Sequence, residues 1–305
     1  MDFELSPDQQ DVMAAVGLLL ERRAGPERAR EAQAAGGYDA ELMAALIEAG
    51  FADFAAAGAG PLEAVLTTER VAVAAGCVPY AARALIAPAL LPAPLPDVLV
   101  VLPDDLRAPV RFAAQAQAFL AVRGEEVVRL DPAELEVEPV DSPFRFPFAS
   151  VAWSGEGGET VEGASAEDLR RFARTAVAAE MVGCMEGALD LTVAYLSDRH
   201  QFGRPIGSFQ AVQHRLAELH VRVDGARWLT RQAAWREAPA DLAAVAATAA
   251  SEAAAQTVSE THQLTGAMGL TEEYDLHLWT MRLAALRLEL GGAAEHAAAA
   301  APRES

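Results

Sequence analysis

The chain has 305 residues, of which 52% are hydrophobic, so it can bury a sizeable core as one large domain or as about two to three smaller ones. Its formal net charge is −20 and all 24 basic residues are arginines, a balance that disfavours binding to nucleic acid or to anionic membranes. Aromatic residues make up only 6% while Ala is abundant, which favours closely packed helices over a large sheet.

The amino-terminal third, residues 1–91, predicts a compact helical domain. Ser6 and Pro7, with Gln9 three residues after the serine, form a helix start with a capping box. Apolar residues at helical spacing follow. Helices are therefore predicted at Pro7 to Arg23, Tyr38 to Gly50, Pro61 to Ala75, and Tyr80 to Ala87, where Pro88 ends the last one.

The cellular location is expected to be the cytoplasm. The acidic amino terminus lacks the basic region and apolar run of a signal peptide, and no uncharged apolar stretch reaches the length of about 18 residues that spans a bilayer. Cys77 and Cys184 lie in apolar helical contexts without a CxxC pair, which indicates buried free thiols in a reducing compartment.

Residues 92–163 predict a small β domain. Prolines between Pro92 and Pro109 break any long helix, and the segment ends in a glycine-rich stretch, Ser154 to Gly163, that is predicted to be an exposed loop. No phosphate-binding glycine motif occurs in it. The short runs of β-forming residues are Val98 to Leu102, Phe119 to Val122 and Val127 to Leu130.

Residues 164–305 predict a helical bundle, because long helical patterns alternate with brief connections. Ser165, with Asp168 three residues later, caps the first helix. No Glu-x-x-His pair indicates a di-iron site, and no metal is expected. The predicted helices run from Ser165 to about Asp198, from Ser208 onward, from Pro239 to near Gly266, and from about Glu273 to Leu286, followed by a short Ala-rich tail.

Between the first two bundle helices, Arg199, Gln201 and Phe202 precede a short window of Gly and Pro residues. An arginine offers donors that match phosphate oxygens, and an aromatic ring beside it can lie against a flat heterocycle, as a nucleotide cofactor requires. An ordinary helix–helix corner gives the same spacing. Near the end of the third helix, Gln263 and Gly266 equally fit a plain helix C-terminus with a glycine cap.

Three strings nevertheless resemble the flavin-dependent acyl-CoA dehydrogenases: F-E-L-S-P-D-Q-Q at the amino terminus, Arg199 to Leu219, and His262 to Leu278. The order of helices, small β region and bundle is also that family's order. The resemblance implies the acyl-CoA dehydrogenase fold, mainly α with a reduced β domain, and an FAD cofactor. By position it implies that FAD contacts come from Arg199, Gln201, Phe202, Ile206, Phe209 and Gln210, and from Gln263, Gly266 and Ala267.

The chain also departs from the family pattern. The Thr-Glu-Pro, Gly-Ser-Asp and Trp-Ile-Thr segments that hold the flavin ring and acyl-CoA are missing between Pro92 and Gly163. The family's reaction needs a carboxylate base. In the family this base lies at one of two positions. The first matches Leu290 or Gly291 in this chain and the second matches Ala173, and none of these residues accepts a proton. Glu289 and Glu180 remain as weak candidates, and for Glu180 a structural ion pair is favoured.

With these departures the chain resembles the short subunit of actinobacterial steroid side-chain acyl-CoA dehydrogenases, which are α2β2 heterotetramers. The favoured hypothesis is that this chain completes the adenine and pyrophosphate side of an FAD site in a larger catalytic subunit, which holds most of the acyl-CoA. Two alternatives stay open. One is a self-sufficient homotetrameric dehydrogenase with Glu289 or Glu180 as base, and the other is a purely structural assembly subunit.

Overall fold

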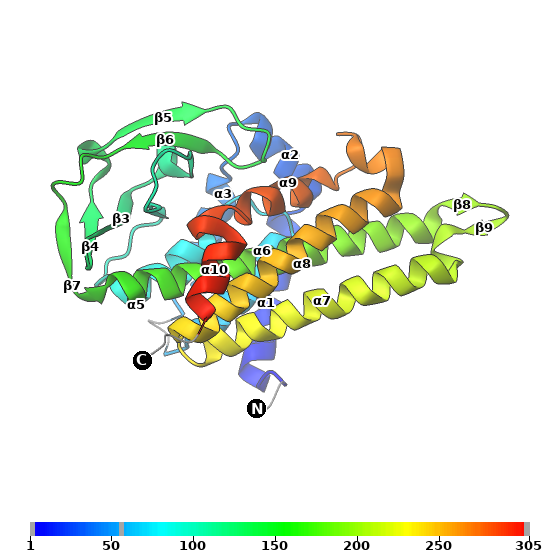
Figure 1. The fold of residues 1–305 in the computed structure, drawn as a ribbon, viewed down its shortest axis with the longest axis horizontal. Coiled ribbons are helices and arrows are strands. Elements are labelled where there is room, and N and C mark those ends of the chain that lie inside the picture. Colours follow the sequence, from blue (N-terminus) through cyan, green and yellow to red (C-terminus); the bar gives the residue numbers. More distant parts are fainter. Residues whose placement is uncertain (1–3, 55–57, 302–305) are drawn as a thin grey trace.

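The computed structural model describes residues 4–54 and 58–301, and these residues are mainly helical, as the composition predicted. Three long helices, α6 (Ala166–Asp198), α7 (Gln210–Trp235) and α8 (Ala240–Thr265), run side by side and form the body of the molecule (Figure 1). Most strands gather at one end of this body, and a narrow two-stranded hairpin projects from the opposite end. The two ends of the bundle therefore present different surfaces.

The helices predicted in the amino-terminal third are confirmed in outline, and α1 begins with the expected capping box at Ser6. The helix expected to stop at Pro88 instead continues, because a π-helical turn (Ala82–Ile86) precedes it and Pro88 lies in the first turn of α5, where no backbone donor is needed. A helix after Gly25 was not predicted. The remaining helices are α1 (Pro7–Arg23), α2 (Pro26–Ala34), α3 (Ala40–Glu48), α4 (Pro61–Val73), α5 (Ala87–Leu90), α9 (His277–Leu286) and α10 (Gly292–Ala300).

The β region forms two small sheets, with strand orders β1-β3-β4-β7 and β2-β6-β5. The three predicted strands are confirmed, but the expected loop from Ser154 to Gly163 is partly wrong, because its second half pairs antiparallel with β4. The strand forms because β4 supplies its hydrogen-bond partners, and the local sequence of residues 159–163 does not indicate this pairing. The strands are β1 (Leu99–Val101), β2 (Val110–Arg111), β3 (Ala118–Arg123), β4 (Glu126–Leu130), β5 (Glu136–Val140), β6 (Phe148–Ala152) and β7 (Glu159–Ser165).

Helix α6 is the centre of the apolar core, with buried residues on several faces along its 33 residues. Small residues let neighbours approach it closely: Gly183 faces the α4 backbone, and Gly187 faces the Trp279 ring. Helix α8 buries a series of alanines against it. The apolar clusters contain residues from all three predicted domains, so the boundaries after residues 91 and 163 stay a prediction.

The carboxyl-terminal segment differs from its prediction in two ways. The fourth bundle helix, α9, begins at His277 rather than near Glu273, and the Ala-rich tail forms a further helix, α10. Gly291 and Gly292, with φ of 83° and 74°, make the turn between them. Positive φ at two consecutive residues favours glycine, so the chain can reverse onto α8 at this point.

Replacing Ser165 by Ala should lower the free energy of unfolding by about 1 kcal/mol. The Ser165 hydroxyl accepts the Asp168 backbone N–H at 3.2 Å, and the Asp168 carboxylate accepts the Ser165 N–H at 3.0 Å. Urea titration would measure the change. Ser259→Ala, at an exposed position inside α8, is the matched control and should leave stability unchanged or slightly raised. Equal losses in both variants would contradict a capping role.

Candidate functional site

The loop between α6 and α7 folds as a tight hairpin. β8 (His200–Gln201) pairs antiparallel with β9 (Arg204–Pro205), and Phe202 and Gly203 form the two-residue turn between them. Both turn residues have positive φ, 55° and 80°, as a type I′ turn requires. Glycine adopts this backbone freely, whereas a bulky residue such as Phe202 is strained in it. Strain of this kind is concentrated at functional sites.

The hairpin exposes the side chains predicted to meet a nucleotide. Phe202 is 92% exposed, and its ring lies edge-on to the Phe209 ring, with 6.2 Å between centroids. Arg199 and Gln201 are also exposed, and within residues 4–54 and 58–301 their side chains form no hydrogen bond or ion pair. The Arg204 guanidinium instead lies over Phe209. An arginine fork, an amide and an aromatic ring therefore remain open to an external ligand.

The other predicted residues of this motif lie just behind the hairpin. Ile206 belongs to a short 3-10 turn (Ile206–Ser208), and Phe209 precedes α7. Both are partly buried, while Gln210 is exposed in the first turn of α7. Ile206 donates its backbone N–H to the Arg199 carbonyl at 2.8 Å, which closes the base of the hairpin. These residues form the support of the hairpin rather than its tip.

The second predicted motif lies where α8 ends. Gly266 is the C-cap, with φ 61° and ψ −142°, a backbone that favours glycine, and a 3-10 turn (Gly266–Leu270) follows. Gln263, Gly266 and Ala267 are exposed, and Leu270 in the same turn is exposed as well. The plain helix-cap interpretation is thus correct for the backbone, and it leaves the side chain of Gln263 at the surface.

Both motifs lie at the same end of the bundle. Arg215 of α7 pairs with Glu260 of α8 at 2.6 Å, and the rings of Tyr195 and Tyr274 are 5.4 Å apart between α6 and the segment before α9. No hydrogen bond or ion pair joins the hairpin to the turn after Gly266 in the part of the chain that the structure describes. The structure therefore brings both motifs to one end of the bundle without a direct polar contact between them.

Glu180 and Glu289, the two candidate bases, meet at one arginine, Arg111. Its Nη1 donates to Glu180 Oε2 at 2.8 Å, its Nη2 donates to Glu289 Oε2 at 3.0 Å, and its Nε pairs with the same Glu289 carboxylate. Burial raises the pKa of Glu180, and the charge of Arg111 opposes that rise. Burial also disfavours the charged guanidinium, but the two carboxylates outweigh it and raise the pKa of Arg111.

Sequence reasoning missed Arg111 altogether. A signal was present, because an arginine between two apolar β-forming residues, Val110 and Phe112, indicates a buried cation that needs carboxylate partners. The guanidinium also lies over the Phe146 ring, 4.5 Å from its centroid. The pairing of Glu180 expected from the sequence is confirmed, and Glu289 is engaged in the same way. Neither carboxylate projects freely into a space where a substrate could bind.

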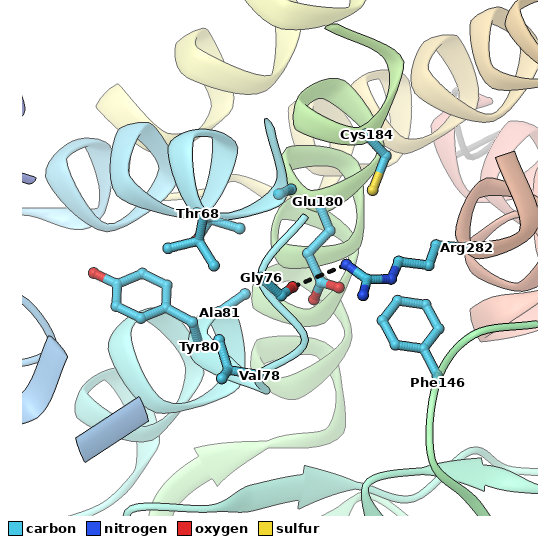
Figure 2. A pocket seen from close by; sticks show the side chains of 11 residues that line it. Thr68, Gly76, Val78, Tyr80, Ala81, Phe146, Glu180, Cys184 and Arg282 are labelled. Atoms are coloured by element: carbon cyan, nitrogen blue, oxygen red, sulfur yellow. Dashed lines mark hydrogen bonds between the residues drawn. The ribbon is translucent and has the colours of Figure 1, made fainter. Parts of the chain in front are cut away.

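A small cavity lies beside Glu180 (Figure 2). Its volume is about 20 Å³, which is room for one water molecule and not for a thioester. Arg282, almost fully buried, donates from Nη1 to the Gly76 carbonyl at 3.1 Å across the cavity wall. Burial raises the pKa of the Cys184 thiol, which also lines the cavity, to about 12. Cys184 and Cys77 are buried free thiols, as predicted.

Comparison with known proteins identifies the group to which the chain belongs. Residues 166–300 match the family model "Acyl-CoA dehydrogenase, C-terminal domain". Relatives named acyl-CoA dehydrogenase IpdE2 are 32% identical in Mycolicibacterium smegmatis (91% of this chain, 93% of the relative) and 33% identical in Mycobacterium tuberculosis (90% of each). The chain belongs to the acyl-CoA dehydrogenase family. The ChsE4-ChsE5 complex from Mycobacterium tuberculosis contains a chain of similar fold, with 25% identity, a TM-score of 0.85, and coverage of 98% of this chain and 97% of that one.

The acyl-CoA dehydrogenase fold is thereby confirmed. Because the chain belongs to this family, the residues at the two positions where the resemblance placed a catalytic base are of interest. Ala173 is buried in α6, and Leu290 lies in the kink between α9 and α10 with φ 53°. Neither carries a titratable group. No helix among the described residues is long and apolar enough to cross a bilayer, and no group of three or more His, Cys, Asp and Glu side chains there is suited to a metal ion.

Proposed function

We propose that this chain is a subunit of an FAD-dependent acyl-CoA dehydrogenase and supplies the adenine and pyrophosphate side of the FAD site to a larger catalytic partner, in an α2β2 assembly. The observation that carries the proposal is the contrast between the two regions described above. The cofactor-type side chains Arg199, Gln201 and Phe202 project from an exposed hairpin, whereas Glu180 and Glu289 are held by Arg111 beside a cavity of about 20 Å³.

These residues fit one part of the cofactor and not the rest. The Arg199 guanidinium can donate to pyrophosphate oxygens, and Phe202 can lie against the adenine. When bound, FAD supplies hydride acceptance, which none of these side chains provides. The cavity beside Glu180 cannot hold a flavin ring or an acyl chain, so we assign both to the partner. The similar fold of a chain in the ChsE4-ChsE5 complex favours such a partner. The resemblance to steroid side-chain enzymes favours a steroid CoA ester as substrate.

Arg199→Ala should lower the FAD affinity of the complex with a co-expressed larger acyl-CoA dehydrogenase subunit by about 10- to 100-fold, because one charge-assisted hydrogen bond contributes about 1.5–3 kcal/mol. Flavin absorbance per assembled complex measures it. Arg107→Ala is the control, since that arginine is 90% exposed and, among residues 4–54 and 58–301, forms an ion pair with Asp105 alone.

Two outcomes would contradict the proposal. Unchanged flavin content in the Arg199→Ala complex would favour the purely structural subunit. A chain that is yellow when purified alone and oxidises an acyl-CoA would favour the self-sufficient homotetramer, with Glu289 or Glu180 as its base.

A further inference from the structure

Arg204, the second arginine of the hairpin, is held against an aromatic ring. The residue is exposed, and its guanidinium carbon lies 3.9 Å from the centroid of the Phe209 ring. Its side chain forms no hydrogen bond or ion pair within residues 4–54 and 58–301. A guanidinium that stacks on a ring carries its N–H groups at its edge, where they can still donate. The donors of Arg204 are therefore open to an external acceptor.

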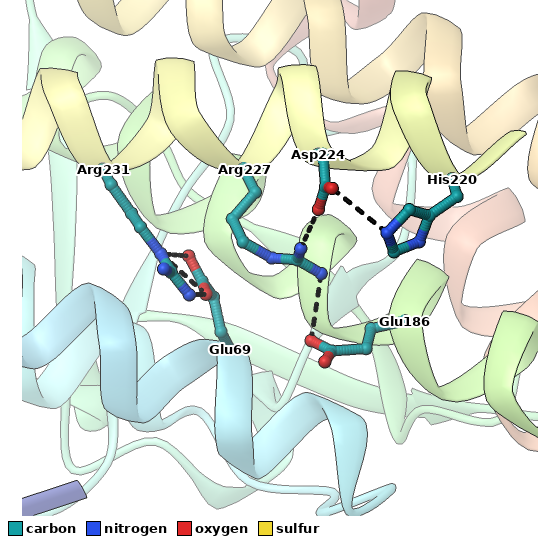
Figure 3. Close-up of polar contacts among 6 residues, drawn as sticks. All are labelled: Glu69, Glu186, His220, Asp224, Arg227 and Arg231. Atoms are coloured by element: carbon teal, nitrogen blue, oxygen red, sulfur yellow. Dashed lines mark hydrogen bonds and ion pairs between the residues drawn. The ribbon is translucent and has the colours of Figure 1, made fainter. Parts of the chain in front are cut away.

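Two arginines of the adjoining helix α7 show what a structural role looks like in this chain (Figure 3). Arg231 donates to the buried carboxylate of Glu69 on α4, with 2.5 Å between Nη2 and Oε2. Arg227 pairs with Asp224 on α7 itself and with Glu186 on α6, the latter at 3.2 Å. Each of these cations is neutralised by a carboxylate and joins two helices. The hairpin arginine does neither.

The strand register of the hairpin places Arg204 on the same face as two of the predicted cofactor contacts. Gln201 and Arg204 are directly opposite each other in the pairing of β8 with β9, so their side chains share one face. Arg199 lies two residues before Gln201, and its backbone is extended, with φ −76° and ψ 113°. Side chains two residues apart on an extended backbone share a face. Arg199 and Arg204 are thus diagonal neighbours, about 7–8 Å apart across the hairpin.

The hairpin is also a local exception to the negative charge of the chain. The chain has 44 Asp and Glu residues among its 305, yet none of them occurs from Arg199 to Ala217. This stretch contains three arginines, of which Arg215 pairs with Glu260 of α8. The other two remain together on one face of the hairpin. Neighbouring cations repel each other, and an anion bound between them removes that repulsion.

We propose that Arg204 is a second phosphate-binding residue of this face, so that Arg199 and Arg204 together hold the two phosphate groups of the FAD pyrophosphate. The inference rests on the proposed function and extends it to a residue that the sequence resemblance did not include. A diphosphate carries negative charge on two adjacent groups, and two guanidinium forks on one face offer donors to both. The ligand class of this face is therefore an adenine nucleotide with two linked phosphates.

Competition against FAD tests the inference on the complex with the co-expressed larger subunit, after removal of bound flavin and with flavin fluorescence as the readout. Arg204→Ala should weaken the binding of FAD and of ADP about 10- to 100-fold, as expected for the loss of a charge-assisted hydrogen bond. Arg204→Lys should recover part of this loss, because an ammonium group keeps the charge and lacks the fork. Arg236→Ala is the matched control and should leave the affinity unchanged. Arg236 is exposed at the far end of α7, with its guanidinium carbon 5.1 Å from the Trp235 ring centroid.

Adenosine separates phosphate binding from a purely structural effect. Because this competitor has no phosphate, it should bind the wild-type and Arg204→Ala complexes equally. Equal losses of adenosine and ADP binding would overturn the inference, since Arg204 would then act only by supporting Phe209 and the hairpin. Unchanged ADP affinity in Arg204→Ala would also overturn it, and a loss in Arg199→Ala would still leave the proposed function intact. If neither variant changed the affinity, the inference and the proposed function would both fail.

Discussion

Arg111→Ala should lower the free energy of unfolding by about 3–5 kcal/mol, which is the range for breaking a buried ion pair by removing one partner. The side chain of Arg111 is 11% exposed, and its removal leaves the carboxylates of Glu180 and Glu289 without their cation. Urea titration followed by circular dichroism measures the change. Arg107→Ala, which breaks an exposed pair in the same region, should leave the free energy of unfolding nearly unchanged.

The loss should depend on pH in a defined direction. Burial already raises the pKa of Glu180, and without the opposing Arg111 charge it rises further. The folded variant then binds more protons than the unfolded chain, so its stability falls as the pH rises above the ordinary glutamate value. The difference between wild type and variant should therefore be smaller at pH 5 than at pH 8. If the difference in unfolding free energy between wild type and variant did not change with pH, the carboxylates of Glu180 and Glu289 would not be buried in the folded variant.

Gly183→Ala should lower the free energy of unfolding by about 3 kcal/mol. A Cβ at this position would overlap the Glu69 carbonyl oxygen and lie 2.6 Å from the Ala72 Cβ, and both belong to α4. Two packed helix backbones cannot move apart without losing their other contacts. The same substitution at Gly17, where the Cβ has nothing within 4 Å, should instead raise stability by about 0.5–1 kcal/mol.

The opposite signs make the pair of glycine variants informative. Both replacements add one methyl group within a helix, so helix propensity predicts the same gain for each. Any difference between them reports the contact between α4 and α6. If both variants gained stability, the close approach of α4 to α6 at Gly183 would be incorrect.

Features coded by local sequence could be predicted. Ser6 and Ser165 start α1 and α6 as expected, since a cap and its partner are three residues apart and need no tertiary information. The π-helical turn before Pro88 and the strand β7 could not be, because a distant packing surface or a partner strand decides each of them.

The candidate site shows the same division. The hairpin motif and the Gln263 to Ala267 turn were found from their residues, and their role as cofactor contacts stays a prediction. The meeting of Glu180 and Glu289 at Arg111 joins residues up to 178 positions apart, and spacing along the chain carries no information about it. Pairing alone could be expected for Glu180, because a carboxylate in a packed helix needs a partner.

The turn at Phe202 and Gly203 bears on how tightly any assembly can form. A flexible loop that orders on binding loses conformational freedom at that moment, and the loss is subtracted from the affinity. Here a two-residue turn with both φ angles positive, paired between two short strands, fixes the backbone beforehand, and the Phe202 ring lies edge-on to the Phe209 ring. The hairpin is thus preorganised, and a surface that receives it gains affinity without having to order the loop.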